Sequence, residues 1–484
     1  MKIYLINSNR LLPPVFPVGL TYIATVAKEA GHDVKILDLN LPRENRGKNE
    51  SVYQYDNVDK AITEAIREYS PDVIGISIRN IDNVTMVRSA YYIPAIKKIA
   101  DKCKEISNAP IVLGGPGFSM MPKEIMAEID VPYGVIGEGE RAFPALLAWL
   151  DKSVATSIDI PGVIYKDGDT FIRNNYKNMT SPELNERQFP NLDIFNTRLY
   201  CDFGGMANLQ TKRGCDRKCT YCTYPVIEGR RYRYRSPAKV VDEIVSMQEE
   251  GVKYIHLSDS TFNIPNWHAI GICKEMVKRG VKIKWTPYMS PFEPSKELLE
   301  LCIETGCDGI VYGSDSLSDK MLVSMRKGFT LKDIEKCAEL CNELELPYSF
   351  NILFGAPGET KETVRESLAN IERIKPVAVG AMIGVRCYPK TQIWKSAIKQ
   401  GVITQKTNLL EPFYYTSPTI DREWLINTVT EYNKNHDNFF SPRSEEGPHT
   451  NELIMEIYKD GIRGPFWEIY GEFIRRAKAK KTQK

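Results

Sequence analysis

The stretch GCDRKCTYC, residues 214–222, decides how the rest of the chain is interpreted. Its cysteines Cys215, Cys219 and Cys222 are spaced C-x3-C-x2-C and directly follow an expected strand. Thiolates this close in sequence can bind one iron–sulfur cluster without help from distant segments. Three protein ligands on a four-iron cluster leave one iron open for a further ligand, as in catalytic metal sites. The motif therefore predicts a 4Fe–4S cluster.

The alternative is a structural zinc site. Closed zinc sites usually take four ligands, and no second C-x2-C pair occurs in the chain. Basic residues flank the triplet, and their charge would favour thiolates and an anionic cluster. They are Lys212, Arg213, Arg217 and Lys218. The pairs Cys302/Cys307 and Cys337/Cys341 are expected to be core residues.

Short apolar runs alternate with helical segments such as Pro237–Glu250 over residues 207–400. The expected strands are Ala207–Lys212, Tyr254–Leu257, Lys282–Thr286, Gly309–Tyr312, Tyr348–Phe354 and Val379–Val385. Six strand–helix units in sequence predict an open barrel or a doubly wound sheet.

Strand and helix also alternate over residues 1–150. The expected strands are Ile3–Ile6, Val34–Leu39, Val73–Ile78, Ile111–Leu113 and Val135–Ile136. Their β-branched runs predict an α/β fold with a doubly wound, Rossmann-like parallel sheet. Such sheets bind ligands at their C-terminal strand ends, and glycine-rich loops follow two of these strands, at residues 114–117 and 137–140.

Two further segments complete the expected domain organisation. Residues 151–206 predict a β-hairpin around Asp167-Gly168 and then a polar linker. Residues 401–484 are expected to be mostly helical or irregular, and their aromatic residues suit either a substrate-capping region or a core. The expected boundaries are thus 1–150, 151–206, 207–400 and 401–484.

Composition excludes several classes of protein. The 484 residues carry a net charge of only +2, which argues against a strongly basic nucleic-acid binder. No apolar run approaches the roughly 20 residues that span a bilayer. The first seven residues read as a strand and not as a signal peptide. Eleven cysteines without a secretory signal indicate metal or redox chemistry in the cytoplasm.

The cysteine motif, with an aromatic residue before its third cysteine, resembles the signature of radical SAM enzymes. Further similar segments follow in order: Leu257–Asn263, Gly313–Ser316, Met325–Gly328, Phe354–Thr360 and Arg386–Thr391. The resemblance covers roughly residues 205–400 and implies a partial (β/α)6 TIM-type barrel that binds a 4Fe–4S cluster and S-adenosylmethionine. The S-adenosylmethionine contacts that it implies are Tyr221, Ser258, Asp259, Ser314, Asp315 and Arg386. The family's usual Gly-Gly-Glu is replaced at 258–260, and Asp315 stands where Glu is commoner.

A sheet domain before such a core resembles the cobalamin-binding branch of the family, the class B radical SAM methyltransferases. The cobalamin contacts that it implies are Ser8, Asn9, Gly114, Gly115, Pro116, Gly137, Glu138 and Gly139. Glycines there would let the backbone approach a flat macrocycle. Cobalamin domains that supply a histidine to cobalt use Asp-x-His-x-x-Gly, and none of the five histidines has Asp two positions earlier. We therefore expect no protein histidine beneath cobalt, with the loop Asn7–Pro17 covering that face.

The resemblance implies a methyltransferase that uses a 5′-deoxyadenosyl radical and methylcobalamin to methylate an unactivated carbon or phosphorus centre. The alternative keeps both cofactors but rearranges or oxidises its substrate, or transfers the aminocarboxypropyl group. A non-enzymatic sensor is disfavoured, because a sensor needs no reducible cluster. Cys387, at the end of the sixth expected strand, is a further candidate for a catalytic residue.

The expected partners are a small-molecule, natural-product or lipid-type substrate and an external electron donor of the ferredoxin or flavodoxin type. Neither a nucleic acid nor a membrane span is expected, and the chain is expected to act as a monomer.

Overall fold

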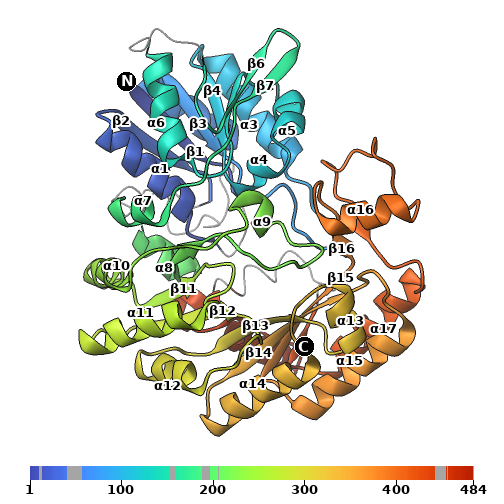
Figure 1. The fold of residues 1–484 in the computed structure, drawn as a ribbon. Helices are drawn as coiled ribbons and strands as arrows, with labels where there is room; N and C mark the ends of the chain where they lie inside the picture. The colour runs from blue at the N-terminus through green and yellow to red at the C-terminus, as the bar shows by residue number, and fades with distance from the viewer. Residues whose placement is uncertain are drawn as a thin grey trace. The chain divides into compact units, whose positions relative to one another are not determined.

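The computed structural model describes residues 1–9, 14–40, 57–151, 158–187, 197–204, 206–441, 454 and 456–482. The chain divides into two compact units, which Figure 1 draws in a colour gradient along the sequence. The first unit contains Met1–Asn83 and Tyr91–Tyr200, and the second contains Val84–Ala90 and Cys201–Lys484.

The first unit is built on a seven-stranded mixed sheet of order β2-β1-β3-β4-β5-β6-β7. Its strands are β1 (Lys2–Asn7), β2 (Asp33–Asp38), β3 (Val73–Ser77), β4 (Ile111–Gly114), β5 (Tyr133–Val135), β6 (Val163–Asp167) and β7 (Thr170–Arg173). The first five are parallel, and β6 and β7 form the expected hairpin, which extends the sheet antiparallel. Because β1 lies between β2 and β3, strands are added to one side of β1 first and then to the other. Open α/β sheets bind ligands at the point where the strand order reverses in this way.

Helices accompany these strands along the chain. They are α1 (Val18–Glu29), α2 (Val58–Tyr69), α3 (Ile93–Ile106), α4 (Pro116–Met120), α5 (Pro122–Ile129), α6 (Gly139–Leu150), α7 (Ser181–Glu186) and α8 (Thr197–Gly204). α7 and α8 both lie within the segment 151–206 that was expected to end in a linker, and residues 188–196 of that segment lie outside the described residues.

The second unit contains a seven-stranded, all-parallel sheet of order β18-β15-β14-β13-β12-β11-β8. Its strands are β8 (Ala207–Leu209), β11 (Tyr254–Leu257), β12 (Lys284–Met289), β13 (Ile310–Asp315), β14 (Tyr348–Phe354), β15 (Ala378–Ile383) and β18 (Phe439–Phe440). The α/β class and the partial barrel are thus confirmed. The edge strand β18 was not expected, because a two-residue aromatic pair has no readable periodicity.

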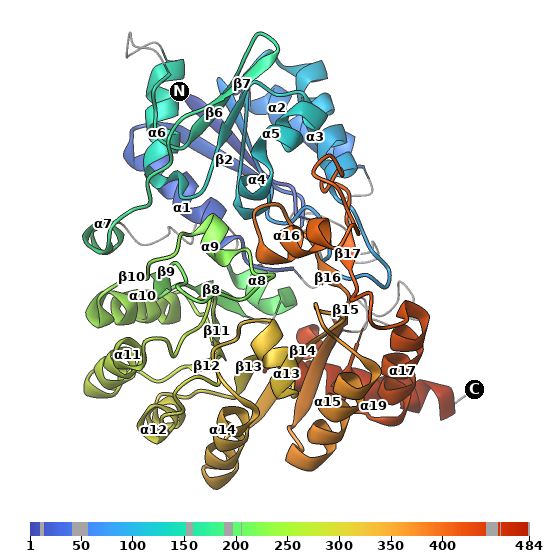
Figure 2. The same ribbon diagram turned by 45° about the vertical axis from the view of Figure 1, so that its right-hand side comes forward.

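Helices of the second unit alternate with the strands along the chain, and α10, α11, α12, α14 and α15 lie in a row along the outside of the sheet (Figure 2). The helices of this unit include α10 (Pro237–Glu249), α11 (Asn266–Lys278), α12 (Lys296–Glu304), α13 (Asp319–Ser324), α14 (Leu331–Glu343) and α15 (Lys361–Ile374), followed by α16 (Gln392–Lys399), α17 (Arg422–Asn435) and α19 (Phe466–Thr482). Several start at side-chain caps, which satisfy backbone N–H groups and fix where each loop ends. Ser236 caps α10, and Thr330 forms a capping box with Asp333 at α14.

One segment from the N-terminal half belongs to the second unit. Residues Val84–Ala90 are assigned there. A Cβ built on Gly384 would lie 2.7 Å from the sulfur of Met86, and the Ser89 hydroxyl donates to the Tyr414 hydroxyl at 3.3 Å. No helix in the described part of the chain is both long and apolar enough to cross a membrane.

Candidate functional site

The cysteine triplet lies on a closed loop at the C-terminal end of β8. β9 (Lys212–Arg213) pairs antiparallel with β10 (Arg233–Tyr234), so the loop between them returns to its own start. Gly214 has φ +90°, and a Cβ there would lie 2.1 Å from the Arg231 carbonyl oxygen. The Cys215 N–H donates to the Gly229 carbonyl at 3.1 Å. Only glycine fits directly before the first cysteine, since a side chain would meet backbone.

Glu228 holds this loop closed from inside. Its Oε2 accepts the Gly214 N–H at 3.0 Å, and its Oε1 accepts the Gln210 amide at 3.1 Å. The Arg233 guanidinium donates to the Glu228 carbonyl at 2.5 Å. One carboxylate therefore ties the entry of the cysteine loop to its exit.

A second set of contacts binds the loop to later strands of the barrel. The Thr220 N–H donates to the Met325 carbonyl at 3.1 Å, and the Ile393 N–H donates to the Thr220 carbonyl at 2.8 Å. Thr220 stands between the second and third cysteines, so these backbone bonds fix the ligand loop against the segments after β13 and β16 (Val385–Arg386).

Tyr221, Asp315 and Lys327 form a buried polar group beside the cysteines. The Tyr221 hydroxyl and the Lys327 ammonium both donate to Oδ2 of Asp315. The side chains of Lys327 and Asp315 are 8% and 15% exposed. Burial opposes the charge of Lys327, but Asp315 and Cys219 outweigh it, and the pKa of Lys327 is raised. The site therefore keeps a buried cation next to the thiols.

The cysteines fit a cluster better than a single metal ion. Burial raises the pKa of Cys219, and burial together with Cys219 raises the pKa of Cys222 to about 12. Among the described residues, no group of three His, Cys, Asp or Glu side chains is arranged to hold one metal ion. In a cubane each thiolate bonds a different iron, so three separated thiols on one loop, without a fourth ligand, suit it.

The basic residues that flank the cysteines were expected to favour thiolates and an anionic cluster, and for the iron-loaded chain this stays a prediction. Lys212 is fully buried, and burial lowers its own pKa to about 8. Because burial raises the pKa values of Cys219 and Cys222, both are protonated thiols in the metal-free chain despite the basic residues that flank them. A bound metal deprotonates a coordinating thiol outright, so the thiolates here depend on iron.

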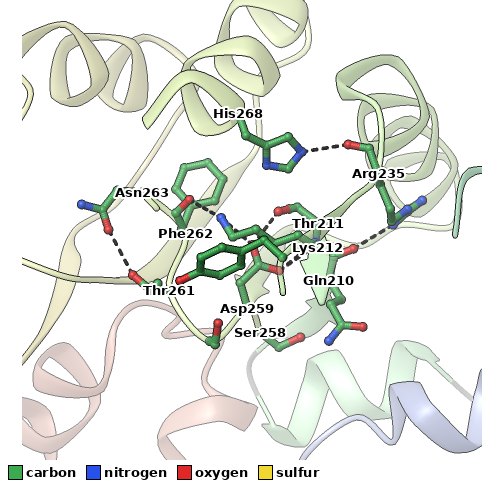
Figure 3. A network of polar contacts seen from close by, with 12 residues as sticks. Gln210, Thr211, Lys212, Arg235, Ser258, Asp259, Thr261, Phe262, Asn263 and His268 are labelled. Atoms are coloured by element: carbon green, nitrogen blue, oxygen red, sulfur yellow. Dashed lines mark hydrogen bonds and ion pairs between the residues drawn. The ribbon is translucent and has the colours of Figure 1, made fainter. Parts of the chain in front are cut away.

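Asp259, two residues beyond β11, organises the strand that leads into the cysteine loop (Figure 3). Its Oδ1 accepts the Thr211 N–H at 2.7 Å, and its Oδ2 accepts the Thr211 hydroxyl at 2.5 Å. The Lys212 ammonium lies 3.8 Å from the same carboxylate and donates to the Phe262 carbonyl at 2.6 Å. Asp259 is thus engaged by protein donors, which favours a positioning role; its contact with S-adenosylmethionine stays a prediction.

His268 completes the network of Figure 3. Burial lowers the pKa of His268, so the ring is neutral and its Nε2–H donates to the Arg235 carbonyl at 2.8 Å. Arg235 in turn forms an ion pair of 2.6 Å with Glu243 of α10, and both side chains are almost fully buried. The network therefore fastens the end of β10 to the helices behind the sheet.

The remaining S-adenosylmethionine candidates also use their polar atoms within the protein. The Ser258 hydroxyl donates to the Leu209 carbonyl at 3.2 Å, and the Ser314 hydroxyl donates to the Asn351 carbonyl at 3.0 Å. The Arg386 guanidinium donates to the carbonyls of Cys387 and Leu409 at 2.7 and 2.8 Å. Their roles as cofactor contacts stay predictions.

Cys387 is fully buried, and burial raises its pKa to about 11. Its thiol is therefore protonated near neutral pH and is a weak nucleophile. This setting matches a core cysteine better than a catalytic one.

The cobalamin candidates of the first unit gather at one edge of its sheet. Asn7, the last residue of β1, is in register with Ser77 of β3, and Ser77 with Gly114 of β4. Ser8 follows directly, and its hydroxyl donates to the Ser77 carbonyl at 2.7 Å. Gly137, Glu138 and Gly139 follow β5 on the same edge. The structure therefore brings the sequence-predicted loops together at the C-terminal strand ends.

The glycines on this edge have a structural reason of their own. Gly115 has φ +102°, and a Cβ there would lie 2.6 Å from the Ile78 carbonyl oxygen. Gly137 has φ +71°, and a Cβ there would lie 2.3 Å from the Tyr176 ring. The protein's own packing thus requires glycine at both positions, and closeness to a macrocycle is not needed to explain them.

His32 lies at the opposite edge of this sheet. It precedes β2, whose first residue pairs with Lys2 at the start of β1, and its Nδ1 lies 3.4 Å from the N-terminal ammonium. A six-residue strand is about 20 Å long, so His32 cannot reach the C-terminal edge. Residues 10–13 of the loop expected to cover cobalt lie outside the described residues.

Three residues of the cluster site were not singled out from the sequence. Glu228 and Tyr232 belong to the ligand loop but have no motif of their own, and Lys327 occurs within a quoted segment without an assigned role. The sequence feature that could have drawn attention to Glu228 is the charge of the loop. Residues 212–235 contain eight Lys or Arg, and Glu228 is one of only two Asp or Glu among them.

Comparison with known proteins gives two domain matches. Residues 6–147 match the B12 binding domain, and residues 209–371 match the Radical SAM superfamily. Apart from Val84–Ala90, the first match falls in the first unit, and the second match falls in the second unit.

Individual relatives extend over most of the chain. The chain is similar to tryptophan 2-C-methyltransferase of Streptomyces laurentii, with 25% identity over 82% of this chain and 74% of the relative. It is similar to anaerobic magnesium-protoporphyrin IX monomethyl ester cyclase of Cereibacter sphaeroides, with 27% identity over 72% of this chain and 55% of the relative. A solved structure of TsrM from Kitasatospora setae, a radical S-adenosylmethionine methyltransferase with tryptophan and aza-SAM bound, matches with a TM-score of 0.84 and 25% identity over 99% of each chain.

Proposed function

We propose that this chain, a cobalamin-dependent radical SAM enzyme, methylates an unactivated carbon or phosphorus centre of a small molecule. Its cofactors are a 4Fe–4S cluster, S-adenosylmethionine and cobalamin. The observation that carries the proposal is the presence of both cofactor-binding domains in one chain. An ordinary nucleophile takes a methyl group from S-adenosylmethionine directly and needs neither domain. Similarity to a tryptophan methyltransferase over 82% of the chain supports the same conclusion.

The bound cofactors would supply the radical and the transferable methyl group, while the protein supplies orientation and a dry site. Cys215, Cys219 and Cys222 would hold three irons of the cluster and leave the fourth open. Tyr221 and Lys327 fix the ligand loop through Asp315, and the Lys327 ammonium offsets negative charge in the buried site.

The proposed substrate is a small organic molecule of the natural-product or lipid type. The net charge of +2 is low for a protein that binds nucleic acid through its phosphates. An external ferredoxin- or flavodoxin-type protein is the proposed source of electrons, since the cluster must be reduced in every turnover that forms a radical.

The second candidate function keeps the cofactors but leaves no methyl group in the product. Similarity to a magnesium-protoporphyrin cyclase favours it, although the chain matches only 55% of that relative. Transfer of the aminocarboxypropyl group belongs to the same alternative.

Anaerobic incubation with S-adenosylmethionine labelled by deuterium in its methyl group tests the proposal. We expect labelled methyl in the product by mass spectrometry, with about one 5′-deoxyadenosine and one S-adenosylhomocysteine for each methyl added. 5′-Deoxyadenosine without S-adenosylhomocysteine, on the true substrate, would favour rearrangement or oxidation. Formation of 5′-methylthioadenosine would indicate aminocarboxypropyl transfer.

A further inference from the structure

A row of aromatic side chains connects the first cluster cysteine to the protein surface. The Tyr232 hydroxyl lies 3.7 Å from the sulfur of Cys215. The Tyr232 ring stacks on Tyr234 with centroids 6.2 Å apart and planes at 27°. Tyr234 meets the edge of Trp267 at 5.1 Å. Successive rings are therefore in contact from the ligand sulfur to the start of α11.

Trp267 ends this row in solvent. It is 62% exposed, although Trp is among the residues with most to gain from burial. The neighbouring rings Tyr234 and His268 support it from beneath, at 5.1 and 5.6 Å. β10, α10 and α11 lie together on this side of the second unit (Figure 2). An exposed Trp held on an aromatic base is typical of the centre of a protein–protein contact.

The segment that contains the row is strongly basic. Residues 212–235 have eight Lys or Arg and two Asp or Glu, a surplus of six positive charges in a chain whose net charge is +2. Lys212, Arg213, Arg233 and Arg235 are buried and serve the loop itself. Lys218, Arg230 and Arg231 are exposed, and Arg217 is half-buried in an ion pair with Asp216. The exposed charge on this surface is thus positive.

The exposed cations Lys218, Arg230 and Arg231 have no evident role in folding or in closing the cysteine loop. Within this segment Lys212 pairs with Asp259, Arg217 with Asp216 and Arg235 with Glu243. None of these carboxylates pairs with Lys218, Arg230 or Arg231 in the part of the chain that the structure describes. Positively charged surfaces steer and orient acidic partners, with an effect that salt weakens. Arg and Trp together are also the residues most enriched in binding hot spots.

We propose that the surface formed by Lys218, Arg230, Arg231 and Trp267 docks an acidic one-electron carrier protein that reduces the cluster. This inference rests on the proposed function, because only a redox cluster needs such a donor. The carrier loses one electron, the cluster gains it, and no bond or proton is exchanged. Tyr234 and Tyr232 lie between Trp267 and the Cys215 sulfur and are neither oxidised nor reduced. Their rings fill this space, so that no layer of water separates the docked carrier from the ligand sulfur.

The test uses the cluster-loaded full chain and a reduced, acidic plant-type ferredoxin as the donor. Arg230→Glu/Arg231→Glu should weaken ferredoxin binding at least tenfold at low salt, measured by titration calorimetry. Trp267→Ala should weaken it by a similar factor. At donor concentrations below Kd, stopped-flow bleaching of the cluster by ferredoxin should slow at least tenfold in both variants, whereas bleaching by dithionite should not change.

A matched control carries the same change of charge elsewhere. Lys253→Glu/Lys332→Glu alters two exposed lysines, one before β11 at the amino end of the strands and one at the start of α14. This control should leave Kd and the bleaching rate unchanged. Equal effects of the two double variants, or no effect of Arg230→Glu/Arg231→Glu, would overturn the docking surface. Binding and cluster bleaching are both measured without substrate. A failure of the docking surface can therefore be told apart from a failure of the proposed methyl transfer.

Discussion

The Tyr221 hydroxyl donates a hydrogen bond to the carboxylate of Asp315, 94 positions later in the chain, and Lys327 donates to the same oxygen. Asp315 adopts φ +60°, a conformation that few residues other than Gly, Asn and Asp accept. The residue between two cluster cysteines is thus fixed by the end of β13. The binding loop is positioned by the barrel before any cofactor arrives.

Asp315→Asn should destabilise the protein, because it leaves the buried Lys327 ammonium without its counter-charge. Breaking one side of a buried pair costs about 3–5 kcal/mol, while Asn retains the size and accepts the positive φ. Thermal unfolding of the cluster-free chain measures the loss. The double variant Asp315→Asn/Lys327→Gln removes both charges and should recover part of it; a double variant that is less stable than Asp315→Asn would contradict the pair.

Gly214→Ala should prevent the cysteine loop from closing. Its Cβ would lie 2.1 Å from the Arg231 carbonyl, at φ +90°. We expect iron content after anaerobic reconstitution to fall several-fold. Gly251→Ala is the matched control, because Gly251 has φ +87° but nothing within 4 Å of the added Cβ. Equal iron content in the two variants would contradict the role of the close approach to Arg231.

Replacing Cys215, Cys219 and Cys222 together by Ala should abolish the brown absorbance and the roughly four irons per chain of the reconstituted protein. A control variant, Cys337→Ala/Cys341→Ala, changes two buried thiols of α14 and should retain iron while losing about 1–2 kcal/mol in stability for each small cavity. Retention of about four irons in the triple variant would disprove the assignment.

Cobalt should have no nitrogen ligand from a protein histidine. The motif Asp-x-His-x-x-Gly is absent, and His32 lies at the amino end of β1, across the sheet from the glycine loops. EPR spectra of the cobalt(II) form of the loaded protein should show no nitrogen hyperfine splitting from a lower protein ligand. A triplet splitting that disappears in His32→Ala would contradict this prediction.

Sequence patterns were sufficient for the elements with strong periodicity and for the cofactor motif. β14 was predicted at its observed bounds, Tyr348–Phe354, because aromatic and β-branched residues dominate this short run, with only Ser349 and Asn351 interrupting it. Contacts between side chains that are distant in the sequence could not be predicted from it. Nothing near Lys327 in sequence indicates Tyr221, and Glu228 gives no sign that it accepts from Gly214, since both contacts arise only when the barrel has closed.

The glycines near the expected cobalamin site have a structural role that the sequence did not reveal, and their contact with cobalamin stays a prediction. Gly115 and Gly137 were interpreted from the sequence as space for a macrocycle, but their positive φ values and close backbone and ring neighbours explain them without a ligand. Asp259 is a parallel case: a motif position suggested a cofactor contact, whereas its carboxylate accepts three hydrogen bonds from Thr211 and Lys212. A motif locates a site, but packing decides which atoms are free to serve it.

Glu359, between β14 and α15, predicts a specific pH dependence of stability. Burial raises its pKa from 4.5 to about 7, although Thr363 and the Gly355 N–H donate to its carboxylate. Between these two values the unfolded chain binds fewer protons than the folded chain, so this group makes stability fall as pH rises from about 4.5 to about 7. The loss is complete above pH 7 and amounts to about 3 kcal/mol.

Glu359→Gln should remove this contribution, so that the apparent Tm falls less between pH 5 and pH 8 than it does in the parent protein. Glu362→Gln, three residues later, is the control. Glu362 is exposed and its pKa is lowered by backbone and Thr360 hydrogen bonds, so its own contribution has the opposite sign and is present only above its pKa. Differential scanning calorimetry of the cluster-free chain at the two pH values measures both. The same fall in Tm for Glu359→Gln and the parent would show that Glu359 is ionised in the folded protein throughout this range, held by the Gly355 and Thr363 donors against the cost of burial.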